Sequence, residues 1–280
     1  MRADLHVHST ASDGTLTPAQ LVTRALGRGL TVLALTDHDS LEGLVQAHDA
    51  ARGTTLRVIP GVEFSAAVGD RSVHLLGYFV DASNPPLQRL LARLREARAR
   101  RGEAIVGALQ QGDYDVTVAQ VQRLSDGGAL GRTHIARALV ECGHAANIPD
   151  AFARLIGRGM PFYRPKEDVA PSEFLKAISS AGGISVLAHP GITQADDLID
   201  SMVEDGLLGI EAYHVEHSAA QRGRYAALAD ERGLLVTGGS DFHSPCSPGR
   251  DLGSSRVPDA AVEALIAAGT ALESERGELQ

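Results

Sequence analysis

Histidine and carboxylate residues recur along this chain at spacings that suit a metal centre. In chain order the members are His6, His8, Asp13, His38, Glu63, His74, His134, His189, Asp241 and His243. Residues two apart on a strand point to the same side, so both imidazoles of His6-x-His8 can face one ion. Imidazole combined with carboxylate oxygen suits Mn, Zn or Fe better than Mg or Ca alone. The pattern therefore predicts a site for divalent cations.

Short apolar runs precede most of these residues and predict the strands that position them. The expected strands are Ala3–Val7, Thr31–Thr36, Leu56–Glu63, Ser72–Phe79, Gly183–Ala188, Leu207–Ala212 and Leu234–Gly238. Helical patterns separate most of them, as over Pro18–Gly29, where Thr17 is a suitable N-cap. Such alternation favours a parallel sheet with crossover helices. Because the carboxyl ends of parallel strands form one rim, the polar residues should converge there.

The middle of the chain has a different pattern, helical and without strands. Leucines at helical spacing mark a long amphipathic helix after Pro85, and shorter helices are expected near Thr133–Cys142 and Pro149–Gly157. We therefore expect an α/β domain over 1–84 and 166–280, interrupted by an all-helical insertion over 85–165 that caps the site. The basic run LREARARRGE in this insertion is interpreted as a solvated helix face rather than a binding surface.

Composition excludes some classes of protein. The chain has 280 residues and a formal net charge of −9, which argues against a broad basic surface for nucleic acid. Its two cysteines, Cys142 and Cys246, are far apart and imply neither a disulfide framework nor a zinc–thiolate site. We find no signal-like start and no apolar run of membrane-spanning length, and we expect a cytoplasmic protein with no membrane partner.

Several residues allow two interpretations. His189, in the AHP triplet, could protonate a leaving oxygen or contact phosphate, or it could orient a metal ligand. Arg132 could present its guanidinium to a phosphate or form a structural salt bridge. Asp37 and Asp39 are interpreted as capping or ligand-orienting residues. The remaining histidines are expected on the surface or in the core; they are His48, His144, His214 and His217.

The strings DLHVHSTASDG, LALTDHD, PGVEFS, AHP and GGSDFH together resemble the PHP (polymerase and histidinol phosphatase) family. The resemblance covers almost the whole chain. It implies a distorted seven-stranded (β/α) barrel with two or three divalent cations at the carboxyl rim, with Mn²⁺ expected and Zn²⁺ or Fe²⁺ as alternatives. It also implies that His6, His8, Glu63 and Asp241 hold the first ion. Glu63 would bridge to a second ion held by His74 and His134, and a third would be held by Asp13, His38 and His243.

Within that family, GRTHIARAL and GMPFYRPK most resemble nucleoside 3′,5′-bisphosphate phosphatases and 5′-to-3′ exoribonucleases. The implied substrates are small phosphorylated nucleotides, hydrolysed at the 3′-phosphate, or the 5′ end of short RNA. The candidates for contacting substrate phosphate are Arg132, Arg158, Arg164, Lys166 and Arg250. The alternatives are a histidinol-phosphate phosphatase and a regulatory module that binds without cleaving. An amidohydrolase that needs a carbamylated lysine is disfavoured, because no lysine follows a predicted strand.

Overall fold

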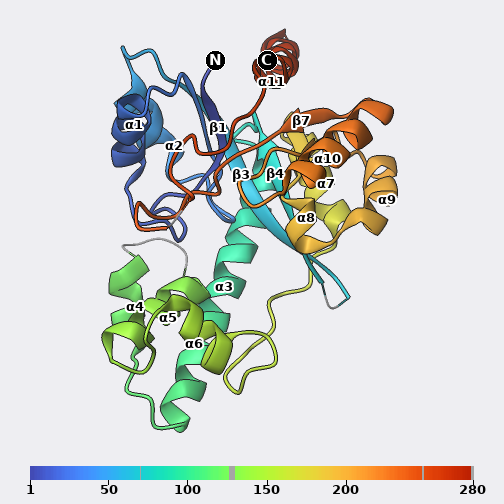
Figure 1. Ribbon diagram of the computed structural model, residues 1–280. Coiled ribbons are helices and arrows are strands. Elements are labelled where there is room, and N and C mark those ends of the chain that lie inside the picture. The colour runs from blue at the N-terminus through green and yellow to red at the C-terminus, as the bar shows by residue number, and fades with distance from the viewer. Residues whose placement is uncertain (70, 126–129, 248, 279–280) are drawn as a thin grey trace.

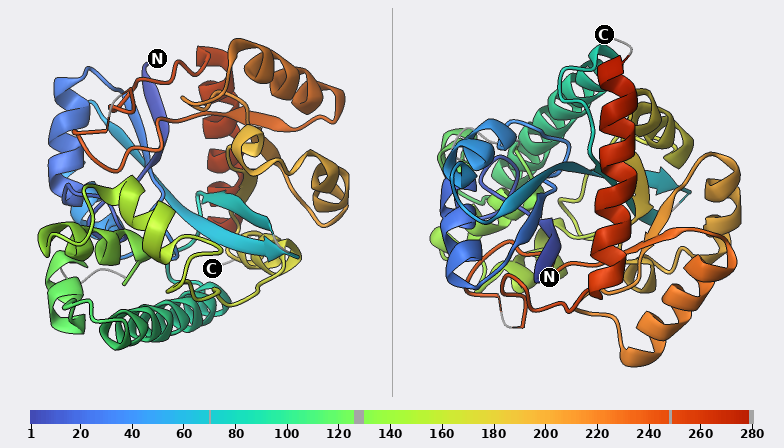
Figure 2. Two further views of the ribbon diagram at one scale, coloured as in Figure 1. Left: turned by 60° about the horizontal axis from the view of Figure 1, so that its bottom comes forward. Right: turned by 90° about the horizontal axis from the view of Figure 1, so that it is seen from above.

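The protein is built around one seven-stranded sheet that curls on itself. The computed structural model describes residues 1–69, 71–125, 130–247 and 249–278. The strands pair in chain order; they are β1 (Ala3–Val7), β2 (Val32–Leu35), β3 (Arg57–Val68), β4 (Arg71–Tyr78), β5 (Ile184–Leu187), β6 (Gly209–Glu211) and β7 (Leu235–Thr237). Beyond β7, the carbonyls of Gly238 and Phe242 accept hydrogen bonds from the N–H groups of Leu5 in β1 and of His8 directly after it. The sheet therefore closes, and the predicted distorted (β/α) barrel is confirmed (Figures 1 and 2).

The strand β4 runs against its neighbours, unlike the parallel sheet expected from the sequence. It pairs antiparallel with both β3 and β5, whereas the other strand pairs are parallel. β4 begins at Arg71, too soon after Val68 for a crossover helix, and this permits an antiparallel pair. The amino end of β4 consequently lies at the same rim as the carboxyl ends of the parallel strands. His74, near the start of β4, reaches that rim for this reason.

Successive apolar residues of each strand point alternately to the inner and outer faces of the barrel wall, because side chains on a strand alternate with a period of two. Leu5, Ala34, Ile59 and Leu76 belong to an inner cluster, and residues of the opposite parity pack outward against helices. The outer helices are α1 (Pro18–Gly27), α2 (Leu44–Ala51), α7 (Pro171–Ser180), α9 (Ile199–Glu204) and α10 (Ala219–Glu231). At the start of α1, Thr17 and Gln20 form a capping box, which explains why that helix begins where the sequence predicted.

An irregularity in β1 turns the first two histidines toward the barrel axis. The register between β1 and β2 shifts between Asp4 and Val7. Leu5 packs in the inner cluster, yet Val7, two residues on, packs in the outer one. A bulge of this kind re-aims side chains and is common beside active sites. His6 and His8, on either side of the outward Val7, therefore both face inward.

The last helix, α11 (Asp259–Glu278), closes the inner cluster from the end opposite the rim. Its Val262 and Leu265 are fully buried against Leu5 and Leu76. Figure 2 (right) shows this helix lying across the mouth of the barrel. No helix was predicted for this segment from the sequence, because its apolar residues do not form a clear amphipathic pattern.

The helices between β4 and β5 form a layer beside the rim (Figure 1). This layer ends before α7 and consists of α3 (Pro85–Gln111), α4 (Val118–Ser125), α5 (Arg132–Glu141), α6 (Ile148–Ala151) and a π-helical turn (Phe152–Ile156). The first half of α3 packs on the barrel through Leu87 and Leu91, and its second half joins a separate apolar cluster with Ile135 and Leu139. Among the helices of the described residues, none is long and apolar enough to cross a membrane.

Candidate metal centre

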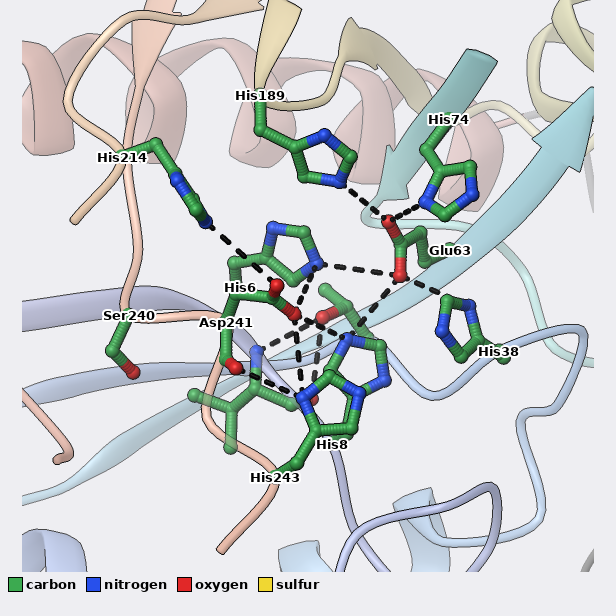
Figure 3. A network of polar contacts seen from close by, with 12 residues as sticks. His6, His8, His38, Glu63, His74, His189, His214, Ser240, Asp241 and His243 are labelled. Carbon is green, nitrogen blue, oxygen red and sulfur yellow. Dashed lines mark hydrogen bonds and ion pairs between the residues drawn. The ribbon is translucent and has the colours of Figure 1, made fainter. Parts of the chain in front are cut away.

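Glu63 lies at the centre of a ring of imidazoles at the barrel rim (Figure 3). Its side chain is buried, and its Oε2 lies 3.0 Å from His38 Nδ1, 3.2 Å from His8 Nε2 and 3.4 Å from His6 Nε2. Its Oε1 lies 2.8 Å from His74 Nδ1 and 3.2 Å from His189 Nε2. The carboxylate is thus positioned so that each oxygen could serve a different cation.

Asp241 completes a group beside the first two histidines. Its Oδ1 lies 3.3 Å from His8 Nε2 and 3.6 Å from His6 Nε2. This residue follows β7 and has a φ of 51°, a left-handed conformation that is uncommon outside glycine and that marks a constrained position. The strain orients the carboxylate toward the barrel axis rather than toward solvent.

A third group lies on the other side of His8. Ligand atoms of His8, Asp13, His38 and His243 lie within 4.8 Å of one another, and His243 Nε2 is 3.3 Å from Asp13 Oδ1. Asp37 holds the loop that carries Asp13. Its carboxylate accepts hydrogen bonds from the backbone N–H and hydroxyl of Ser9 and from the hydroxyl of Ser12. The ligand-orienting interpretation of Asp37 agrees with these contacts.

The unpartnered atoms of the cluster test whether metal ions fit. The buried side-chain atoms without a hydrogen-bond partner include His6 Nε2, both ring nitrogens of His8, His38 Nδ1, Asp13 Oδ1 and Glu63 Oε2. Each such atom is costly to bury, and several of them converging on one region require an explanation. A set of imidazole nitrogens and carboxylate oxygens is the donor set of Zn²⁺, Mn²⁺ and Fe²⁺. Divalent cations therefore fit this cluster.

Electrostatics of the cluster point the same way. Burial by itself would raise the pKa of Glu63, but the surrounding imidazoles, His38 foremost, hold it well below its usual range. Burial likewise opposes charge on His6, whereas Glu211, Glu63 and Asp241 raise its pKa well above the usual value. The carboxylates are therefore ionised, and their negative charge favours the binding of cations.

Glu211 orients His6 and was not identified from the sequence. It is fully buried at the end of β6, and its two oxygens lie 3.1 Å and 3.2 Å from His6 Nδ1. Burial would raise the pKa of Glu211, but His6, His214 and His189 lower it to about 2. By holding the proton on Nδ1, Glu211 leaves Nε2 free for a metal. The available signal was a glutamate at the end of the apolar run LLGIE.

His189 lies inside the cluster. Its backbone N–H donates to Glu211 Oε2 at 2.8 Å, and its ring stacks on that of His6 with centroids 5.7 Å apart. With His6 and Glu63 it forms one of the groups whose ligand atoms lie within 4.8 Å. The sequence left the role of His189 open. In the structure, His189 and His74 both contact Glu63 Oε1.

His134 does not join these groups among the residues that the structure describes. It lies in the first turn of α5, where its Nδ1 accepts the N–H of Gly131 at 3.1 Å. Burial lowers its pKa to about 4, against an opposing effect of Asp13. The assignment of His134 as a metal ligand stays a prediction.

Two further residues contact Asp241. Arg250 donates to Asp241 Oδ2 at 2.9 Å and also pairs with Glu216, so its guanidinium is engaged by carboxylates. His214, which the sequence reading left among core or surface histidines, is buried at the site with Nε2 3.8 Å from Asp241 Oδ2. The hydrogen bond from Arg250 to Oδ2 leaves Asp241 Oδ1 facing His6 and His8.

A cavity of about 200 Å³ adjoins the cluster, and its lining includes Asp13, His38 and His74. The lining also includes four half-buried cations, which are Arg98, Arg101, Arg132 and Lys166. The solvated-face interpretation of the basic run was therefore wrong for Arg98 and Arg101, although Arg100 is exposed. Of the other expected phosphate contacts, Arg158 and Arg164 are not among the described residues that line this cavity.

Comparison with known proteins agrees with this site. The chain is 36% identical over 269 residues to "5′-3′ exoribonuclease Rnm" of Escherichia coli, covering 94% of this chain and 92% of that one. It is 35% identical to the "3′,5′-nucleoside bisphosphate phosphatase" of Chromobacterium violaceum, covering 89% and 90%. A solved structure from Bifidobacterium adolescentis, described as a metal-dependent phosphoesterase, superposes with a TM-score of 0.89 at 35% identity, covering 95% and 96%. The PHP domain matches residues 4–157. The chain therefore belongs to the PHP domain family.

Proposed function

We propose that the protein is a metal-dependent phosphoesterase that removes the 3′-phosphate from nucleoside 3′,5′-bisphosphates and also trims the 5′ end of short RNA. The observation that carries this proposal is a cavity lined both by candidate metal ligands and by four cations. The names of the relatives from E. coli and C. violaceum support the nucleotide class. An anion with two charged groups could contact the metal ions and these cations at once.

Three of the four cations have no carboxylate partner among the residues that the structure describes. No ion pair with a carboxylate is found for Arg101, Arg132 or Lys166 within the described part of the chain. Arg132 lies over the rings of Phe152 and Tyr163, with centroid distances of 5.3 Å and 5.8 Å. Such stacking fixes the guanidinium plane while leaving its N–H groups available. Arg98 is paired with Asp39 and adds to the positive field.

The proposed ligand sets follow the geometry. His6, His8, Glu63 and Asp241 would hold one cation, and Asp13, His38 and His243 another. For the cation between them we propose Glu63, His74 and His189, with His189 replacing His134 of the sequence-based set. When bound, such cations polarise phosphoryl oxygens and lower the pKa of water. Mn²⁺ is the proposed metal, with Zn²⁺ and Fe²⁺ as alternatives.

The chain's own residues would perform the remaining tasks. Arg132 and Lys166 would bind the phosphate that is not hydrolysed, and Arg98 would reinforce them through charge. We propose that residues 85–165, which supply the three arginines, form a cap over the barrel of 1–84 and 166–280. By closing over the substrate, the cap would exclude water and strengthen each of these electrostatic contacts.

The decisive experiment compares substrates with the purified, Mn²⁺-loaded protein. Phosphate release from adenosine 3′,5′-bisphosphate should be much faster than from histidinol phosphate, and a chelator should abolish it. An equal or reversed preference would contradict the nucleotide assignment. Absence of turnover on any phosphoester, with bound metal verified, would instead favour a module that binds without cleaving.

A further inference from the structure

The first turn of α5 contacts the metal centre directly. Thr133, the second residue of this helix, donates from its Oγ1 to Asp13 Oδ2 at 3.0 Å. The two residues are far apart in the sequence and belong to the helical layer and to the loop after β1. A side chain of the helical layer therefore determines how a candidate metal ligand of the barrel is oriented.

The two oxygens of Asp13 have different surroundings. Oδ2 accepts the hydrogen bond from Thr133, whereas Oδ1 is buried, lacks a hydrogen-bond partner and lies 3.3 Å from His243 Nε2. The backbone of the loop is held separately, because Ser9 and Ser12 are bound to Asp37. Because Asp37 holds the backbone of this loop, the hydrogen bond from Thr133 sets the rotation of the Asp13 carboxylate.

We infer that Thr133 is a positioning residue that holds Asp13 Oδ1 toward the cation shared with His8, His38 and His243. This inference rests on the proposed metal centre but not on the proposed substrate. Partners that hydrogen-bond to a metal ligand typically change metal affinity by about 10- to 100-fold when they are removed. Because the preceding residue, Arg132, lines the cavity, the same helical turn connects that cation with the proposed phosphate site.

The test measures metal binding rather than turnover. Thr133→Val keeps the shape of the side chain and removes the hydroxyl, so it should weaken binding of one Mn²⁺ by about 10- to 100-fold in calorimetric titration. The tighter Mn²⁺ sites should keep their affinity, and elemental analysis at limiting Mn²⁺ should show the loss of one ion. Thr133→Ser, which keeps the hydroxyl, should restore the wild-type isotherm.

A matched control separates positioning from general damage to the helical layer. Thr117 also donates and accepts through its hydroxyl, but it caps α4 and is exposed. Thr117→Val should lower the unfolding temperature while leaving the Mn²⁺ isotherm unchanged. If Thr133→Val destabilises the fold, the Asp13→Ala background decides the matter, because Thr133→Val should then change Mn²⁺ affinity no further.

The outcomes are distinct. Wild-type Mn²⁺ affinity at every site in folded Thr133→Val would overturn the inference, as would equal losses in Thr133→Val and Thr117→Val. A wild-type protein that binds Mn²⁺ but cleaves no nucleotide would contradict the proposed function and leave the role of Thr133 intact. A wild-type protein that binds no divalent cation would remove the basis of both.

Discussion

Glu211 and His6 form a buried carboxylate–imidazole pair in which one ring nitrogen faces both oxygens of the acid. The separations of 3.1 Å and 3.2 Å join Glu211, at the end of β6, to His6 in β1. The opposite nitrogen of His6 faces Glu63 and Asp241. Glu211, at the end of β6, therefore orients the imidazole of His6, a candidate metal ligand in β1.

The first prediction concerns this pair. Glu211→Gln preserves size but no longer presents two anionic oxygens to His6 Nδ1, so the ring loses its fixed tautomer. We expect Mn²⁺ affinity to fall by about 10- to 100-fold, as is usual for groups that orient metal-bound imidazoles. Calorimetric titration measures the change. Glu231→Gln, at an exposed position on α10, is the control and should leave the affinity unchanged.

Removal of the central carboxylate should have the largest effect. Glu63→Ala is expected to remove the two cations that Glu63 is proposed to bridge, together with activity, since Glu63 faces five imidazoles through its two oxygens. Elemental analysis of dialysed protein and phosphate release give the two readouts. Chelation of the wild-type protein should reproduce the loss of activity, and added Mn²⁺ should reverse it only in the wild type. Full metal occupancy in Glu63→Ala would contradict the bridging position.

A comparison of two histidines tests which one binds metal. His189→Ala should lose one cation, because its Nε2 lies 3.2 Å from Glu63 Oε1. His134→Ala should keep all cations, since its Nδ1 accepts the N–H of Gly131. The latter variant should instead lose about 0.5–2 kcal/mol of unfolding free energy, the usual cost of a lost helix cap. Metal analysis and urea unfolding of both variants distinguish the roles, and the reverse pattern would reinstate His134 as the ligand.

The fourth prediction is a pH dependence that arises from Lys166. Burial is the main cause that lowers the pKa of Lys166 from 10.5 to about 8. The charges of Arg101, Arg98 and Arg132 add to this shift, whereas the charge of Asp39 opposes it. As pH rises through 8, the free protein loses this cation, so kcat/KM for a bisphosphorylated nucleotide should fall. Folding disfavours the charged amine, so the contribution of Lys166 to stability increases between pH 8 and 10.5.

Variants at the same position provide the controls. Lys166→Arg retains its charge at alkaline pH and should move the fall in kcat/KM upward. Lys166→Met should give a lower kcat/KM without this fall, because no titrating cation remains. An unchanged alkaline limb in Lys166→Met would show that another group causes it.

The strands and the residues at their ends could be read from the sequence. Apolar runs of strand length followed by His6-x-His8, Asp37-His38-Asp39 or Asp241-x-His243 are local patterns, and each is found where it was expected. Convergence at one rim followed as well, since parallel strands share an edge. Eight of the nine expected ligands do converge; they are His6, His8, Asp13, His38, Glu63, His74, Asp241 and His243.

Other features were decided by the tertiary structure alone. The reversal of β4 brings His74 to the rim, and no local pattern encodes the direction in which a strand pairs. The contact of His189 with Glu63 and the pairing of Glu211 with His6 depend on which strand ends lie close together. Likewise, an arginine on a helix has the same local sequence whether it faces solvent, as Arg100 does, or a cavity, as Arg101 does. Periodicity determines the residues at each strand end, but strand order, strand direction and packing determine which of them meet.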